Sequence, residues 1–290
     1  MLIISLIYFV LSYAGAGQSL NIVYTNDFEG NIATCGCATD PGGGVVRLIN
    51  WYRGANLSPT DTVYINSGST LFSGTVYADY EVAAAKNAAE IMSDALLAMN
   101  IDAFTPGEYD TKMGVVPFTA TAKKLPVLLS NSKNKNFPKE IKIDRAGYNV
   151  VILGVSSNKD IASKNFTDVV KSAVKKNRKK NTAIILLADM DEKNLNKILK
   201  QVKGIDVVLS SSPDEQLTQP KIINNSVVIR ILKGGDSVGL LKYDPSSKKE
   251  RYDNQIFYLG KMYDKENEFS PRLKKYEELQ KSAAPRYKDQ

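Results

Sequence analysis

The sequence predicts an α/β fold in which strands and helices form separate layers. Short apolar runs of the kind that form buried strands recur along the chain, and turns or helical segments separate them. Helical periodicity is clearest in residues 80–99, which place six apolar side chains on one face: Val82, Ala85, Ala89, Met92, Leu96 and Met99. A hydrophobic content of 43% in 290 residues is sufficient for a substantial core. We therefore expect a folded α/β protein and not a disordered chain.

Each element is placed by its own pattern. Apolar runs bounded by polar or turn residues indicate strands at residues 20–25, 62–65, 103–105, 127–130, 150–155, 183–187, 207–209 and 227–231. Helical periodicity indicates further helices at residues 44–53, 166–176 and 192–202. Residues 234–243 and 255–258 are typical of closing antiparallel strands, and residues 270–290 of a terminal helix packed on the surface. The single tryptophan, Trp51, is expected to be buried between its helix and a sheet.

The positive charge of the chain is not concentrated in a nucleic-acid site. Lys and Arg total 38 and Asp and Glu 31, which gives a net charge of +7, but these residues are spread along the sequence. The lysine-rich stretch at residues 171–180 has Val170 and Val174 on its other face. We interpret it as the solvated side of a helix that leads into the next strand. A nucleic-acid partner is therefore not expected.

The N-terminal segment resembles an export signal. Residues 1–16 are mostly apolar and end in Ala14-Gly15-Ala16, which fits a cleavage site of the A-x-A type. No Lys or Arg precedes the apolar run, so a retained membrane anchor is the alternative, although the run is shorter than the roughly 20 residues that span a bilayer. We expect a signal peptide at 1–16, a main domain at 17–261 and a charged helical tail at 262–290. The mature chain is then expected in the periplasm or outside the cell, with no membrane span.

The absence of histidine excludes several kinds of site. None of the 290 residues is histidine, so Ser-His-Asp triads, Cys-His dyads and zinc–histidine centres are excluded in their usual form. The two cysteines, Cys35 and Cys37, flank a single glycine. They form either two thiols or a strained disulfide that stiffens a loop. Two cysteines alone do not complete a zinc site.

The loops after the expected strands resemble those of a known family in their order and spacing. Residues 24–31 read Tyr-Thr-Asn-Asp-Phe-Glu-Gly-Asn, which resembles the opening motif Thr-Asn-Asp-x-His-Gly of the metallophosphatases related to 5′-nucleotidases. The Cys-Gly-Cys segment and the glycines that follow it are similar to the glycine-rich turn of bacterial envelope members. The resemblance continues through residues 63–74, 100–110, 128–131, 186–189 and 206–214. It implies a four-layer α/β/β/α sandwich, here without the family's separate C-terminal substrate-binding domain.

The metal ligands that the resemblance implies are largely replaced. Asp27 is retained, Glu29 stands at the position of the first His, and Ser69 at that of the Asp that bridges the two metals. The Asn-His pair expected after Gly107 is deleted. The remaining positions with lost His ligands are occupied by Asp189, Ser212 and Asp214. A two-metal phosphatase needs metals about 3.5–4 Å apart, and the loss of the bridging carboxylate removes that geometry.

We therefore interpret the chain as a secreted or periplasmic, non-catalytic metallophosphatase-like protein without a cofactor. It is expected to be a binding or envelope-assembly component with a protein partner in the cell envelope. The alternative is an active phosphoesterase or nucleotidase with a metal site made of carboxylates alone. A Ca²⁺ or Mg²⁺ site would then use Asp27, Glu29, Asp189 and Asp214, because clustered carboxylates repel one another unless a cation, Lys or Arg lies between them. Several aromatic residues on or beside the same loops either fill the core and cleft or form a stacking surface: Tyr24, Phe28, Phe72, Tyr77, Tyr80 and Tyr109.

Overall fold

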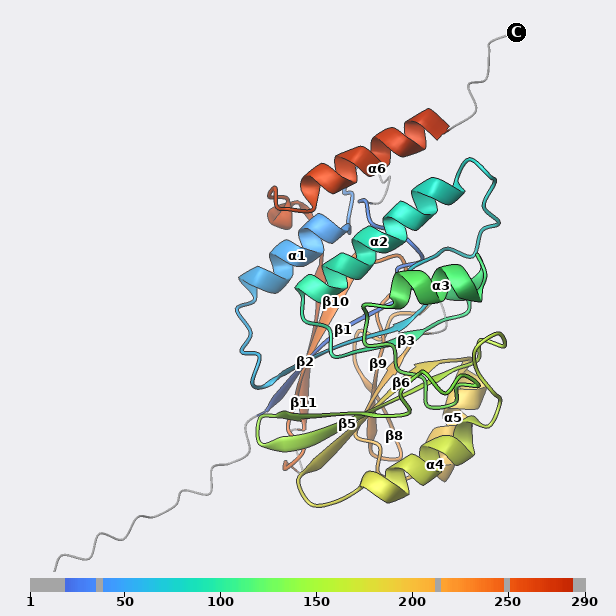
Figure 1. Cartoon of the computed structure of the whole chain (residues 1–290). Coiled ribbons are helices and arrows are strands. Elements are labelled where there is room, and N and C mark those ends of the chain that lie inside the picture. Colours follow the sequence, from blue (N-terminus) through green and yellow to red (C-terminus); the bar gives the residue numbers. More distant parts are fainter. Residues whose placement is uncertain (1–18, 35–38, 212–214, 248–250, 284–290) are drawn as a thin grey trace, which may run out of the picture.

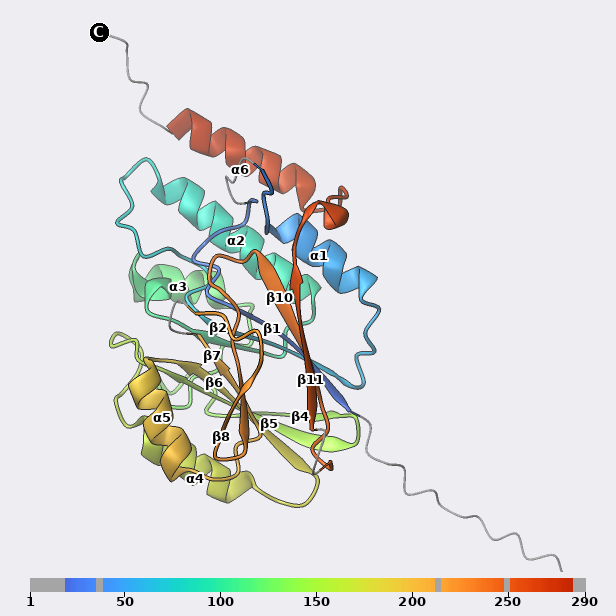
Figure 2. The same ribbon diagram turned by 180° about the vertical axis from the view of Figure 1, so that it is seen from behind.

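The computed structural model describes residues 19–34, 39–211, 215–247 and 251–283 (Figure 1). The expected signal segment, the pair Cys35 and Cys37, and the site positions Ser212 and Asp214 lie outside these residues. The described chain forms two β-sheets that pack face to face, with helices on the outer face of each sheet (Figures 1 and 2). This arrangement confirms the expected α/β/β/α sandwich.

The first sheet has the strand order β11-β10-β1-β2-β3. Its strands are β1 (Leu20–Asn26), β2 (Thr62–Gly68), β3 (Ala103–Pro106), β10 (Ser237–Tyr243) and β11 (Tyr252–Tyr258). The second sheet has the order β4-β5-β6-β7-β9-β8. Its strands are β4 (Ile141–Arg145), β5 (Tyr148–Ser156), β6 (Thr182–Asp189), β7 (Val207–Ser210), β8 (Lys221–Ile223) and β9 (Ser226–Ile229). As expected, β10 and β11 close the first sheet as antiparallel strands.

Helices α1 (Val45–Gly54), α2 (Val82–Ala98) and α3 (Val115–Ala122) cover the first sheet, and α4 (Phe166–Asn177) and α5 (Glu192–Gln201) cover the second (Figure 1). The last helix, α6 (Ser270–Ala283), lies outside α1 and α2 and adds a partial outer layer. Two short 3₁₀ turns, η1 (Tyr109–Thr111) and η2 (Lys261–Tyr263), complete the elements. Within the described residues, no helix combines the length and apolar character that crossing a bilayer requires.

The two-residue period of the strands produces the layers. In β1, Ile22 and Tyr24 point between the sheets, whereas Val23 faces the helices of the first layer. In β6, Ile185 faces the inter-sheet core and Ile184 contacts the α4 and α5 side. Both faces of these central strands are therefore buried, which explains why they read as continuous apolar runs in the sequence.

The lysine-rich stretch and Trp51 take the expected positions. Val170 and Val174 of α4 are buried while the lysines between and after them are exposed. Trp51 of α1 is 3% exposed and its ring lies 5.3 Å from that of Phe257 in β11, so it is buried between helix and sheet.

The strand expected at residues 127–130 is wrong. Only Val127 forms a bridge, to Phe104 of β3. The Leu128 amide donates to the carbonyl of Phe104 at 2.8 Å, whereas the Ser130 amide donates to Gly154 of β5 at 2.6 Å. The segment is apolar because it crosses from one sheet to the other through the core, not because it extends either sheet. The sequence patterns also missed α3, β4 and β8; β4 and β8 are short and only partly buried.

Gly154 of β5 lies directly against Thr105 of β3 and against the crossing segment. A methyl group at its Cα would lie 2.2 Å from Thr105 Oγ1 and 2.7 Å from the Leu128 carbonyl oxygen. We therefore predict that Gly154→Ala lowers the free energy of unfolding by about 1–3 kcal/mol through overpacking.

The matched control is Gly54→Ala, at the end of α1, where a Cβ would meet no atom within 4 Å. That change should be neutral or stabilising by up to about 1 kcal/mol, because alanine favours the helix. Urea unfolding of the three proteins measures both effects, and equal stability of the two variants would contradict the sheet contact.

Candidate functional site

The loops that follow several parallel strands open at the same edge of the sandwich. In one sheet β2 pairs in parallel with β1 and with β3, and in the other sheet β6 pairs in parallel with β7. The carboxyl ends of the strands in each set therefore lie at the same edge. The loops enclose a cleft of about 340 Å³. It is lined by Asn26, Asp27, Glu29, Ser69, Glu108, Tyr109, Ser157, Asp189, Met190, Asp191, Ser211 and Lys233.

The structure brings together four residues that the sequence singles out, namely Asp27, Glu29, Ser69 and Asp189. It also places three charged residues there that the sequence analysis gave no role. Glu108 directly follows Gly107, the residue after which the Asn-His pair of the resemblance is missing. Lys233 follows β9 and precedes a Gly-Gly turn. Asp191 is committed to capping α5, because its Oδ1 accepts from the Asn194 amide at 2.7 Å.

The turn after β1 fixes Asp27 against the loop after β2. Asp27 and Glu29 have φ values of 45° and 52°, in the left-handed region that non-glycine residues rarely adopt. Asp27 Oδ1 accepts a hydrogen bond from the Ser69 amide at 2.9 Å. Gly68 permits this approach, because a Cβ there would lie 2.1 Å from the same oxygen. The carboxylate oxygen is thus committed to a protein contact.

Ser69 connects two of the loops. Its Oγ accepts from the Tyr109 amide at 3.0 Å, which joins the loop after β2 to the 3₁₀ turn after β3. In the resemblance, this is the position of the carboxylate that bridges two metals. A hydroxyl here supplies neither the charge nor the two oxygens of that ligand.

Asp110 holds the same turn from below. Its Oδ1 accepts from the amides of Thr70 and Leu71 at 2.9 and 2.7 Å, and its Oδ2 accepts from Gly107 at 3.0 Å. The side chain is fully buried, and burial raises its pKa to about 7 although the backbone amides act in the opposite direction. Asp110 is therefore a structural link between two loops of the cleft.

Burial also disfavours ionisation of two carboxyl groups in the cleft. Asp189 Oδ2 accepts from Ser156 Oγ at 2.7 Å, and burial, with the charges of Asp110 and Glu108 adding to it, raises the pKa of Asp189 to about 7. Burial raises the pKa of Asp27 well above its usual value, and the charge of Asp189 adds to the effect.

Two cations of the protein compensate the negative charge. Lys233 Nζ lies 3.7 Å from Glu29 Oε1 inside the cleft. Arg230, at 1% exposure, lies behind the cleft wall and donates from Nη2 to Ser210 Oγ at 3.1 Å. Asp27 is among the carboxylates whose charge acts on Arg230. The turn that carries Lys233 is held to β1, because the Gly234 amide donates to the Asp27 carbonyl at 2.7 Å.

The side chains in the cleft do not fit the two-metal centre that the resemblance implies. Among the described residues, no group of three or more His, Cys, Asp or Glu side chains is arranged to hold a metal ion. Asp27 Oδ1 and Ser69 Oγ are already hydrogen-bonded to backbone amides, and an ammonium group lies beside Glu29. We therefore derive no catalytic step through metals at this site.

The aromatic residues on these loops divide into two groups. Tyr24, Phe28 and Phe72 are at most 2% exposed and belong to the core, as packing predicted. Tyr109 lines the cleft, whereas Tyr77 and Tyr80 line a second pocket beside it.

Comparison with known proteins identifies the fold. No protein-family model matches the chain, and no curated protein matches its sequence. Solved structures do match, and they include a 5′-nucleotidase precursor from Thermus thermophilus, with a TM-score of 0.71 and 18% identity over 91% of this chain and 59% of that one. The calcineurin-like phosphoesterase YfkN from Bacillus subtilis matches with a TM-score of 0.68 and 15% identity, over 92% of this chain and 99% of that one. The NAD nucleotidase NadN from Haemophilus influenzae matches with a TM-score of 0.66 and 15% identity, over 83% of this chain and 50% of that one.

The chain therefore has the fold of the metallophosphatases related to 5′-nucleotidases, and the expected resemblance is confirmed at the level of fold. It spans 59% of the Thermus protein and half of the Haemophilus protein, but nearly all of the Bacillus structure. At identities of 15–18%, the likeness does not transfer activity or substrate to this chain.

Asp110 predicts a pH-dependent stability. Its pKa is about 7 in the folded protein and 3.8 in a free chain, so between these values the folded state keeps a proton that the unfolded state loses. The stabilisation that this proton gives to the folded state is complete below about pH 4 and is lost as the pH rises to about 7. The free energy of unfolding should fall across this range by at most about 1.4 kcal/mol per pH unit.

In Asp110→Asn the pH dependence that comes from Asp110 should disappear. The variant should also be less stable at every pH, because its amide nitrogen cannot accept the hydrogen bond from the Gly107 amide. Urea unfolding of both proteins from pH 4 to 8 gives the difference in slope. Parallel profiles would show that Asp110 ionises normally in the folded state.

Proposed function

We propose that this chain is a non-catalytic binding protein that keeps the metallophosphatase fold and has lost the metal chemistry. The observation that carries the proposal is the hydrogen bonding of Ser69. Its hydroxyl stands where the resemblance has the bridging carboxylate, and it serves to hold the loops after β2 and β3 together. A side chain used in this way stabilises the cleft without a metal.

The charge distribution supports the same function. Clustered carboxylates need a compensating cation, and in an active two-metal enzyme the metals supply it. Here Lys233 lies beside Glu29, and burial favours the neutral forms of Asp27 and Asp189. The cleft is therefore balanced by the protein's own groups.

We further propose that the chain acts outside the cytoplasm, in the periplasm or beyond the cell, where it binds a protein partner of the envelope. The apolar N-terminal segment with its Ala-Gly-Ala ending supports export. In this proposal residues 17–261 are the binding domain, and residues 262–290 the appended tail.

A second function, metal-dependent phosphoester hydrolysis by a carboxylate site, is favoured by one observation. The cleft is lined by five carboxylates, which come from the ends of β1, β3 and β6: Asp27, Glu29, Glu108, Asp189 and Asp191. Oxygen ligands of this kind suit Ca²⁺ or Mg²⁺. The two functions differ in metal content and in activity.

We predict that the purified protein contains no stoichiometric zinc, manganese or iron by elemental analysis. Hydrolysis of phosphomonoesters and nucleotides in the presence of Mn²⁺, Zn²⁺, Mg²⁺ or Ca²⁺ should not exceed that of buffer. The control is Asp27→Ala, which tests any residual rate. Activity that disappears in this variant would overturn the non-catalytic proposal, whereas activity that survives it comes from a contaminant.

Lys233 provides a test of charge balance. If its ammonium group replaces a metal, Lys233→Met should leave the carboxylates uncompensated and make the melting temperature rise with Ca²⁺, whereas the wild type should not respond. A site with a Kd of about 0.1 mM would stabilise the variant by about 2.7 kcal/mol in 10 mM Ca²⁺.

The matched control is Lys261→Met, an exposed lysine in η2. It should behave as the wild type does. A wild-type protein that already responds to Ca²⁺ would instead support the carboxylate metal site.

A further inference from the structure

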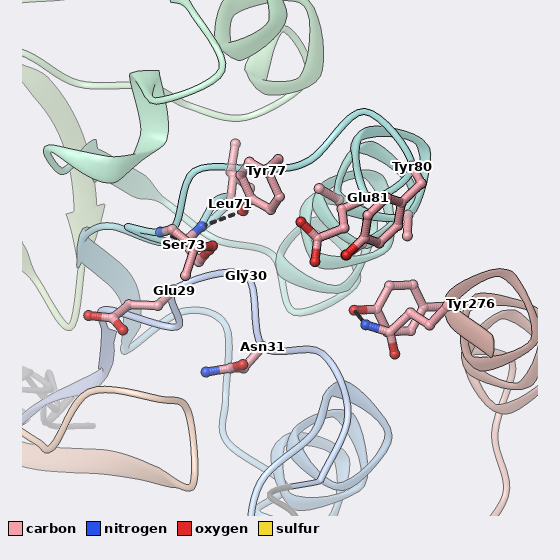
Figure 3. A pocket seen from close by; sticks show the side chains of 14 residues that line it. Glu29, Gly30, Asn31, Leu71, Ser73, Tyr77, Tyr80, Glu81 and Tyr276 are labelled. Atoms are coloured by element: carbon pink, nitrogen blue, oxygen red, sulfur yellow. Dashed lines mark hydrogen bonds between the residues drawn. The ribbon is translucent and has the colours of Figure 1, made fainter. Parts of the chain in front are cut away.

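A second pocket of about 340 Å³ lies next to the cleft, and Glu29 lines both (Figure 3). Its walls come from the loop after β1, the loop between β2 and α2, the first half of α2, and α6. Its volume is within the range of small-molecule pockets, which is about 300–1,000 Å³. The sequence resemblance assigns no role to this pocket.

Three tyrosines and two carboxylates, Glu29 and Glu81, line the pocket. Tyr77 and Tyr80 lie in the segment before α2, and Glu81 directly precedes the first residue of that helix. Tyr276 lies in α6. Tyr80, Glu81 and Tyr276 lie on the same side of the pocket, where α2 faces α6 (Figure 3). The floor is made of small α2 residues, Ala84, Ala85 and Ala88, which leave room above the helix.

Hydrogen bonds fix two of the rings before any ligand binds. The Ser73 amide donates to the Tyr77 hydroxyl at 2.7 Å, and Gln280 Nε2 donates to the Tyr276 hydroxyl at 2.6 Å. Glu81 Oε2 accepts from the Ala78 amide at 2.8 Å, which holds the carboxylate at the start of α2. Preorganised groups of this kind bind a ligand with little loss of side-chain entropy.

Helix α6 is anchored so that Tyr276 faces α2. Arg272 Nη2 pairs with Asp94 of α2 at 2.9 Å, and Glu268, just before α6, pairs with Arg53 of α1. The Asn267 amide group donates from Nδ2 to the Val46 carbonyl of α1 at 2.9 Å. The pocket is therefore built from three segments that lie far apart in the sequence: residues 29–31, residues 71–88 and α6.

The chemistry of the lining selects the charge of the ligand. Glu29 and Glu81 are acidic, and none of the described residues that line the pocket is Lys or Arg. Tyrosine faces attract cations through the ring quadrupole, and carboxylates repel phosphates and other anions. Alkylammonium groups are recognised by such combinations of aromatic rings.

We propose that this pocket binds a small organic cation that carries an ammonium group. The ammonium lies against Tyr80 and Tyr276 with Glu81 as its counter-ion, and the alkyl portion covers the alanines of α2. This inference does not depend on whether the neighbouring cleft binds metal, because only Glu29 is shared.

The test uses the full chain with choline, tetramethylammonium and spermidine as probes, and isothermal titration calorimetry as the measurement. At least one probe should bind saturably with a Kd below about 1 mM, an affinity of about 4 kcal/mol. The uncharged carbon isostere of choline, 3,3-dimethylbutan-1-ol, should bind at least tenfold more weakly. Equal binding of the isostere, or no binding of any cation at 10 mM, would overturn the proposal.

Variants locate the binding to this pocket. Tyr276→Ala and Glu81→Gln should each weaken the binding of the best probe at least fivefold, and Tyr276→Phe should retain most of it because the ring face remains. Glu81→Gln and Tyr276→Phe change little in volume, so the test does not depend on the folding of the alanine variant, which circular dichroism checks. Lys261→Met, an exposed lysine in η2 that does not line the pocket, serves as the control and should leave the affinity unchanged. Cation binding that is unaffected by Glu81→Gln and Tyr276→Ala would place it elsewhere and overturn the assignment.

Discussion

The packing of the two sheets against each other is the constraint on which the rest of the structure depends. The inter-sheet core contains fully buried residues such as Ile22, Ile65 and Ile185, and at Gly154 the packing leaves no room for a methyl group. At the opposite end from the cleft, Asp206 completes the contact between the sheets. It accepts from the Tyr243 hydroxyl of β10 at 3.2 Å and pairs with Arg178 at 2.6 Å. With the sheets fixed at both places, the loops at the cleft edge meet in one arrangement.

The fold and the metal chemistry of this scaffold are separable because they depend on different residues. Hydrogen bonds hold the cleft loops together. They join Asp27 to the Ser69 amide, Ser69 Oγ to the Tyr109 amide, and Asp110 to three further backbone amides. None of these bonds requires a metal. A sequence without histidine can therefore hold these loops in place, because backbone amides and short polar side chains supply the hydrogen bonds between them.

The sequence allowed the central strands to be predicted because both of their faces are buried, so that β5 and β6 are apolar throughout. The same signal was misleading at residues 127–130, where an apolar run crosses between sheets. The family resemblance singled out Asp27, Glu29, Ser69 and Asp189, and they lie in one cleft because the loops after parallel strands converge. Lys233 and Tyr276 were beyond prediction. Their positions depend on the turn held by Gly234 and on the ion pairs of α6, which are tertiary contacts without a local pattern.

The position of β1 has a consequence for how the protein folds. One edge of β1 pairs with β2, which follows soon in the chain, but its other edge pairs with β10, which begins only at Ser237. A nascent chain therefore holds β1 with one unpaired edge until the residues of β10 have been synthesised. Such long-range pairing makes folding slow, and an open apolar strand can meanwhile associate with other chains. Completion of the first sheet is thus a late event, and folding efficiency should depend on how well this edge is shielded while the chain emerges.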